Sequence, residues 1–140
     1  MPNRFELAES FRALHQRETP FVIPNPWDVG SIGKQDNTVT RDEVLEHIGA
    51  IASATSLPVS ADLEKGFGDD PATVAETIRL AAEAGVVGGS IEDSTHRAAD
   101  PVFALEAAAD RVRAAVEAAR SLQFPFTLTA RAENFLVGRP

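Results

Sequence analysis

Short apolar runs alternate with helical patterns along this chain, and this alternation restricts the fold more than any other feature. The apolar runs predict strands over residues 20–24, 57–61, 86–91 and 124–130. The helical patterns predict helices over residues 3–17, 41–54, 71–85 and 101–122. Strands that are apolar throughout and alternate with helices are typical of a parallel sheet covered by helices. The sequence therefore predicts an α/β fold.

Local signals mark the ends of the expected helices. Thr40 and Glu43 have the spacing of a capping box. Asp70 can cap a helix that starts with Pro71 and stops at Gly85. The long Ala-rich helix over residues 101–122 is expected to turn one stripe inward, made of Leu105, Ala108, Val112, Val116 and Ala119.

Polar side chains follow every expected strand. The pairs are, in chain order, Asn25 and Asp28, Asp62 and Glu64, Glu92 and Asp93, and Arg131 and Glu133. The carboxyl edge of a parallel sheet is where ligands bind in α/β folds. Helix capping alone could explain one such pair, but four pairs at one edge favour a site.

The stretch SADLEKGFGDD carries the chemistry of a metal site. Side chains alternate along a strand, so Asp62 and Glu64 can point to the same side. With Glu92 from the adjacent strand they would suit Mg²⁺, or Mn²⁺, because hard cations prefer oxygen ligands. Gly66 and Gly68 would let the loop turn sharply towards a ligand. The alternative is that these are exposed loop acids followed by an ordinary turn.

One cation lies at the end of a strand. Arg131 could hold a substrate carboxylate with two parallel hydrogen bonds, or it could form a salt bridge to Glu133 or Glu92. His15 and His47 are expected on helices as surface or packing residues. His96 follows Glu92 and Asp93, where a position facing the site and a position on the surface are both open.

The composition excludes several classes of function. The chain has 21 acidic and 13 basic residues and a net charge of -8, which argues against nucleic-acid and anionic-membrane partners. It has no cysteine, so disulfides, thiolate metal sites and a Cys acid are excluded. Calcium-loop and phosphate-loop motifs are absent. We expect one cytoplasmic globular domain over residues 1–140.

Five segments together resemble the isocitrate lyase and phosphoenolpyruvate mutase superfamily. They are Pro24-Asn25-Pro26-Trp27-Asp28, Gly33-Lys34-Gln35-Asp36, Ala61-Asp62-Leu63-Glu64-Lys65-Gly66-Phe67-Gly68, Ser90-Ile91-Glu92-Asp93 and Thr129-Ala130-Arg131. The resemblance implies a TIM-type (β/α)₈ barrel and Mg²⁺-dependent chemistry on small 2-oxo or 2-hydroxy carboxylates. In that chemistry C–C or P–C bonds are made or broken through an enolate-like species.

The resemblance also implies roles for individual residues. It makes Asp62, with Glu64 and Glu92, the metal site, and it makes Arg131 the group that binds the substrate's carboxylate or phosphonate. Asp36 matches the acid beside the reacting group. The substrate-binding positions that it implies are Asn25, Trp27, Asp28, Gly66 and Arg131.

The chain departs from the family in the loop after Glu92. Isocitrate and methylisocitrate lyases carry a Lys-x-Cys-Gly-His loop there, whereas residues 93–100 read DSTHRAAD. Those two activities are therefore not expected. Decarboxylases, hydrolases and mutases of oxaloacetate-like or phosphonopyruvate-like substrates remain.

The barrel is expected to be incomplete. The family that the chain resembles has one further βα unit and a Ser/Gly-rich loop at the place of residues 31–34, and the chain stops at Pro140, whereas such barrels have about 250 residues. We expect that a segment is missing between Ser31 and Lys34 and that the residues on either side of it follow one another in this sequence. Consecutive Cα atoms there should then stand much farther apart than the ~3.8 Å of a trans peptide.

Three functions follow from these observations. The first is a Mg²⁺-dependent lyase that cleaves a C–C bond of a small 2-oxo or 2-hydroxy acid through an enolate. The second is a P–C mutase or hydrolase in which Asp36 guides phosphorus. The third is a catalytically silent barrel that binds metabolites or partners. Family members assemble as homo-oligomers, dimers or tetramers, and the assembly of this chain is left open.

Overall fold

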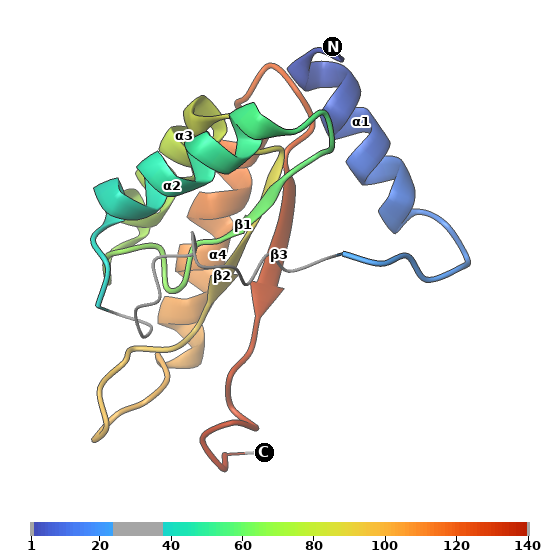
Figure 1. Cartoon of the computed structure of the whole chain (residues 1–140). Helices are drawn as coiled ribbons and strands as arrows, with labels where there is room; N and C mark the ends of the chain where they lie inside the picture. The colour runs from blue at the N-terminus through green and yellow to red at the C-terminus, as the bar shows by residue number, and fades with distance from the viewer. Residues whose placement is uncertain (1, 24–37, 140) are drawn as a thin grey trace.

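The computed structural model describes residues 2–23 and 38–139, which form helices and strands in alternation after two initial helices (Figure 1). The helices are α1 (Arg4–His15), α2 (Arg41–Ala54), α3 (Pro71–Ala84) and α4 (Leu105–Arg120). The strands are β1 (Ser60–Asp62), β2 (Gly88–Glu92) and β3 (Thr127–Arg131). None of the described helices has the length and apolar character that a membrane span requires.

The strands form one parallel sheet in the order β1-β2-β3. Helices α2, α3 and α4 gather to one side of the sheet (Figure 1). The predicted parallel α/β architecture is thus confirmed. Within the described residues the sheet does not close. Parallel pairing brings Asp62 beside Ser90, and Glu92 beside Arg131, at the carboxyl edge.

The predicted helix ends of α2 and α3 are confirmed. Thr40 and Glu43 form the capping box of α2, with each side chain bonded to the backbone of the other. The Asp70 side chain accepts from the Thr73 N–H at the start of α3. Gly85 ends α3 at φ 111°, a left-handed conformation that glycine adopts without a steric penalty.

The main core lies between the sheet and helices α3 and α4. Leu63, Val74, Ile78 and Ile91 are almost fully buried there. Small residues allow these layers to approach closely. A Cβ on Gly89 would stand 2.9 Å from Leu63 Cδ1, so a larger residue there would displace the core.

Helix α1 packs near the end of the sheet where the strands begin (Figure 1). Phe11 is buried there with Val87, and a Cβ on Gly88 would stand 2.8 Å from the Phe11 ring. The His15 ring makes edge contacts with Phe11 and Phe21. The predicted packing role of His15 agrees with these contacts, and α1 lies away from the carboxyl edge.

The strand predicted over residues 20–24 is wrong for its described part. Residues 20–23 have no regular structure, and the Val22 and Ile23 side chains are 89% and 57% exposed. The other strands are confirmed, but each ladder starts later than its apolar run. Pro58 and Pro125 lie in the early parts of two of these runs, where they cannot donate a hydrogen bond to a ladder.

The predicted inward stripe of α4 is only partly confirmed. Ala119 is buried and Ala108, Val112 and Val116 are half-buried, but Leu105 is 80% exposed, and the other buried side chains of this helix are Arg111, Ala115 and Ala118. Residues 101–103 pair with the loop after β2 and do not join the helix, since Val102 bridges Ser94 and the Phe103 N–H donates to the Asp93 carbonyl. The apolar pattern misplaced the centre of the buried face because an arginine, Arg111, occupies it.

Candidate active site

A polar pocket of about 320 Å³ lies at the carboxyl edge of the sheet. Asp62 ends β1, Glu92 ends β2 and Arg131 ends β3, so the parallel register places their side chains at one edge. The residues that line the pocket are Asp62, Glu64, Glu92, Ser94, His96, Arg131, Glu133 and Leu136. Four of the residues predicted from sequence therefore meet in one pocket: Asp62, Glu64, Glu92 and Arg131.

Arg131 lies between carboxylates in this pocket. Its Nη1 donates to Asp62 Oδ2 at 2.9 Å, and its Nη2 donates to Glu133 Oε1 at 2.7 Å. Glu92 Oε2 lies 3.7 Å from Nη1. Burial lowers the pKa of the guanidinium, but Asp62, Glu133 and Glu92 outweigh this and raise it. Arg131 is therefore a permanent cation, and the salt bridges considered as its alternative role are present.

The Asp62 carboxylate is held from both sides. Oδ1 accepts from the Glu64 N–H at 3.0 Å and from Ser90 Oγ at 3.2 Å, while Oδ2 accepts from Arg131. The bond to Glu64 spans two residues and fixes the start of the loop that follows β1. The Asp62 side chain is nevertheless 60% exposed, so it faces the open side of the pocket.

Glu64, Glu92 and His96 form the less exposed wall of the pocket. Their side chains are 17%, 12% and 14% exposed. His96 Nε2 lies 3.4 Å from Glu92 Oε1 and 4.0 Å from Glu64 Oε2, and it makes no hydrogen bond within the described residues. Both Glu64 and His96 have positive φ, 48° and 56°. The structure thus places His96 at the site, one of the two positions left open by the sequence.

The donors of this pocket are of the kind that Mg²⁺ binds. Asp62, Glu64 and Glu92 offer carboxylate oxygens, which are the ligands that this hard cation prefers. Within residues 2–23 and 38–139, no three acidic or histidine side chains stand close enough to enclose an ion by themselves. Because Mg²⁺ keeps several waters and uses few protein carboxylates, an open set still fits. The metal assignment stays a prediction.

Gly66 does not line the pocket. It has φ 81°, and a Cβ there would stand 3.0 Å from Val74 Cγ2 in the core. Its carbonyl accepts from Thr77 Oγ1 at 2.9 Å. The position of Gly66 behind the pocket indicates a role in the turn of the loop, and the predicted contact with substrate finds no support in it.

Several predicted positions lie outside the described residues. They are Asn25, Trp27, Asp28, Asp36 and the join expected between Ser31 and Lys34. Their roles stay predictions.

Glu133 lines the pocket, although it was expected there only as a polar neighbour and possible salt-bridge partner of Arg131. Its side chain is 11% exposed, pairs with Arg131, and its N–H donates to Asp93 Oδ1 at 2.8 Å. The signal that could have found it is its spacing of two residues from Arg131, which directs both side chains to one face if the extended chain continues.

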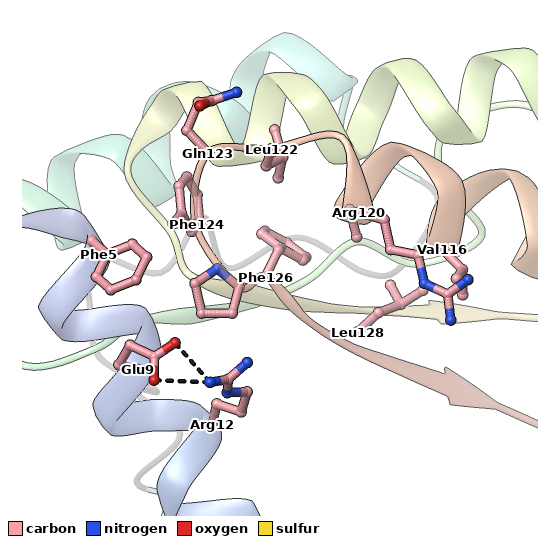
Figure 2. Close-up of a pocket in the computed structure, with 12 residues that line it drawn as sticks. Phe5, Glu9, Arg12, Val116, Arg120, Leu122, Gln123, Phe124, Phe126 and Leu128 are labelled. Carbon is pink, nitrogen blue, oxygen red and sulfur yellow. Dashed lines mark hydrogen bonds and ion pairs between the residues drawn. The ribbon is translucent and has the colours of Figure 1, made fainter.

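A larger pocket of about 600 Å³ lies away from this edge, between α1, α4 and the segment that leads into β3 (Figure 2). Phe5, Phe124 and Phe126 supply much of its apolar wall. Two charged residues of α1 line it, the acidic Glu9 and the basic Arg12, and they neutralise one another in an ion pair. The smaller pocket, which gathers the carboxylates and Arg131, is the better candidate for chemistry on an anion.

A family profile and a curated relative match much of the chain. The profile described as phosphoenolpyruvate phosphomutase covers residues 30–140. The 2-methylisocitrate lyase of Escherichia coli (strain K12) is 38% identical over 96 residues, which are 64% of this chain and 32% of that protein. The chain therefore spans about a third of the length of this curated relative.

Two solved structures extend the similarity to the fold. A protein of Burkholderia cenocepacia J2315, provisionally named a lyase/mutase, is 54% identical with a TM-score of 0.92, over 97% of this chain and 57% of that chain. Phosphonopyruvate hydrolase in complex with oxalate and Mg²⁺ is 28% identical with a TM-score of 0.68, over 74% of this chain and 36% of that chain. Both the fold and the predicted superfamily are confirmed by these similarities.

Proposed function

The chain belongs to the phosphoenolpyruvate phosphomutase family, and from that membership we propose that it is a Mg²⁺-dependent lyase. Its substrate is a small 2-oxo or 2-hydroxy carboxylic acid, and it cleaves a C–C bond. The observation that supports this proposal most directly is the pocket in which Asp62, Glu64 and Glu92 face the Arg131 guanidinium. Such a pocket combines oxygen ligands for a cation with a fixed positive charge for an anion.

Asp62, Glu64 and Glu92 would hold the ion, directly or through water. When bound, Mg²⁺ polarises the 2-oxo group and offsets the negative charge that develops on its oxygen. The ion need not be fully enclosed by protein, because substrate oxygens can replace its waters. Mn²⁺ has a similar ligand preference and could substitute.

Arg131 would bind the substrate's carboxylate. Its Nη2 bond to Glu133 holds the guanidinium plane, while Nη1, which donates one N–H to Asp62, has a second N–H that could donate to the substrate. With a 2-oxo acid such as oxaloacetate, the bond to the terminal carboxylate would break, CO2 would leave, and the electron pair would pass into the 2-oxo fragment as an enolate that takes up a proton. With a 2-hydroxy acid, the hydroxyl would lose its proton and become the 2-oxo group of one product, and the electron pair of the C–C bond would pass into the other fragment, which forms as an enolate and takes up a proton.

A metal-dependence assay with an Asp62 variant tests the proposal. Wild-type chain is incubated with oxaloacetate and with a panel of 2-oxo and 2-hydroxy acids, in Mg²⁺ and in EDTA. We expect turnover that needs Mg²⁺. Asp62→Ala should lower this turnover by more than 100-fold, because losing only an outer-shell partner of a metal ligand typically costs about 10–100-fold. Asp42→Asn, an exposed acid in the first turn of α2, is the control and should keep wild-type turnover.

Two results would contradict the lyase. One is turnover that EDTA leaves unchanged, and the other is the absence of turnover across the whole panel. The second result favours a barrel that only binds metabolites.

The similarity to phosphonopyruvate hydrolase supports a second candidate, cleavage of a P–C bond. The same pocket would then take a phosphonate, with Arg131 on an anionic end of the substrate. Phosphonopyruvate added to the panel separates the two candidates, because only P–C hydrolysis releases inorganic phosphate from it. A mutase would instead convert it to a phosphate ester without that release.

A further inference from the structure

A buried arginine lies beneath the loop that carries Glu64. Arg111 on α4 is 1% exposed, and its guanidinium reaches the loop between β1 and α3. Nη1 donates to the Gly68 and Asp69 carbonyls, both at 2.7 Å, and Nη2 donates to the Lys65 carbonyl. One side chain therefore satisfies three main-chain acceptors within five consecutive residues.

The buried guanidinium of Arg111 is stabilised by the loop carbonyls and by an aromatic ring. Its Cζ lies 4.1 Å from the centre of the Phe103 ring, a cation–π distance. Among the described ion pairs none joins Arg111 to a carboxylate. A buried charge is costly unless it is hydrogen-bonded, so these contacts make the arrangement specific to this loop conformation.

The same ring connects this loop to the loop after β2. Arg97 Cζ lies 5.7 Å from the Phe103 centre, and Arg97 Nη1 lies 2.6 Å from Asp69 Oδ2. Arg97 directly follows His96, which lines the active-site pocket. Arg111 thus contacts the loop that carries Glu64 directly, and it is linked to the loop that carries His96 through the Phe103 ring.

The loop has a backbone that needs such support. Glu64 and Phe67 have φ of 48° and 60°, conformations that side chains other than glycine adopt rarely and only where surrounding contacts impose them. Lys65, whose carbonyl Arg111 binds, follows Glu64 directly. Thr77 supports the same turn through the Gly66 carbonyl. Glu64 is therefore directed into the pocket by contacts made on the far side of its own loop.

We propose that Arg111 is a positioning residue that holds residues 64–69 so that Glu64 faces the pocket beside Asp62. The proposal rests on the proposed function for its consequence, since a displaced Glu64 should weaken metal binding. It assigns to α4 an active-site role although none of its side chains lines the active-site pocket.

Metal binding tests that consequence. Mn²⁺ alone is titrated into wild-type chain, Arg111→Met, Arg111→Lys and Val87→Ala, with free Mn²⁺ followed by electron paramagnetic resonance. Val87 is fully buried in a separate cluster with Phe11 and serves as a control for lost packing. We expect a Kd at least tenfold higher in Arg111→Met, partial recovery in Arg111→Lys, and a Kd within twofold of wild type in Val87→Ala. Equal Kd values in Arg111→Met and Val87→Ala, at a similar loss of melting temperature, would overturn the positioning role.

Hydrogen exchange separates this inference from the proposed function. If wild-type chain binds no Mn²⁺, the proposed metal site is refuted, and the role of Arg111 is then tested only by the exchange rates of the loop amides. We expect Arg111→Met to lose protection in residues 63–69 while α2 keeps its protection, and Val87→Ala to keep the protection of residues 63–69. Unchanged protection of that loop in Arg111→Met would refute the role of Arg111 whatever the metal does.

Discussion

Arg131 bridges Asp62 and Glu133 with two different nitrogens, and a lysine cannot reproduce that geometry. Arg131→Lys keeps the positive charge but loses the planar pair of donors. We expect KM for the substrate to rise about 10–100-fold, in line with about 1.5–3 kcal/mol for a hydrogen bond to a charged group. Steady-state kinetics measures this, with Arg113→Lys on the exposed face of α4 as the control. An unchanged KM would remove Arg131 from substrate binding.

Asp69 gives the loop after β1 a sensitivity to acid. Hydrogen bonds from Lys65, and then from Arg97, lower the pKa of its carboxyl from 3.8 to about 2. A lowered folded-state pKa means that the stabilisation is complete above about pH 4 and is lost as the pH falls through about 2. Because these are surface pairs, each contributes only about 0.2–1 kcal/mol.

We therefore expect Asp69→Asn to be less stable than wild type at pH 7, with the difference shrinking between about pH 4 and 2. Urea unfolding at a series of pH values measures it, and Asp42→Asn controls for the loss of one negative charge. A difference that persists undiminished at pH 2 would contradict the assignment.

Among individual residues, four that line the pocket could be predicted from the sequence. Asp62, Glu64, Glu92 and Arg131 follow strands, and parallel strands deliver their last residues to a common edge. The place of His96 could not be predicted, because it depends on a positive φ in a loop whose course comes from distant contacts. The buried state of Arg111 was also missed, since an arginine in a helix normally marks the solvent side.

Two glycines lie where α2 packs against the end of α3, and replacing them with alanine should have opposite effects on stability. Gly85 has φ 111°, so Gly85→Ala should destabilise the fold by about 1–2 kcal/mol, the cost of a left-handed conformation for an L-residue. Gly49 lies inside α2, and a Cβ there would meet Ala84 only at ordinary contact distances of 3.5 and 3.9 Å. Gly49→Ala should therefore stabilise it by about 0.5–1 kcal/mol.

Thermal or urea unfolding of the two single variants measures these changes. The opposite signs are the informative result, because a general effect of adding a methyl group would move both variants in the same direction. Two shifts of the same sign would contradict the local conformations described here.

Element positions could be predicted where end signals are local. The caps of α2 and α3 follow from Thr40, Glu43, Asp70 and Gly85, whose effects act within one helical turn. The run over residues 20–24 shows the opposite case. Its apolar pattern suited a strand, but a strand also needs a partner, and no pattern within the run could supply one.

For the whole molecule, an excess of acid at one edge predicts a response to divalent cations. Asp62, Glu64, Glu92 and Glu133 share one pocket with Arg131, and the chain has a net charge of -8. A ligand that binds only the folded state stabilises it by about 2.7 kcal/mol at 100 times its Kd. We expect Mg²⁺ to raise the melting temperature of wild type but not of Asp62→Ala.

Differential scanning calorimetry measures that response, with NaCl at the same ionic strength as the control for screening. An equal rise in NaCl would show that Mg²⁺ acts only as a salt. An equal rise in Asp62→Ala would place the bound ion elsewhere.

The parallel sheet and its covering helices could be predicted from periodicity alone, whereas the barrel could be predicted only from the resemblance. Three strands in one layer satisfy the same rules in an open sheet and in part of a barrel, because closure depends on how the outermost strands are continued. The similarity to a solved structure over 97% of this chain resolves that ambiguity in favour of the barrel.

Arg111 hydrogen-bonds only to main-chain carbonyls of the loop after β1, so these bonds do not depend on the side chains of the residues that they hold. Lys65 and Asp69, whose side chains pair with each other and do not line the active-site pocket, could be replaced during evolution while the path of the chain persisted. Tolerance to substitution would thus be high at Lys65 and Asp69 and low at Arg111, a single distant helical position.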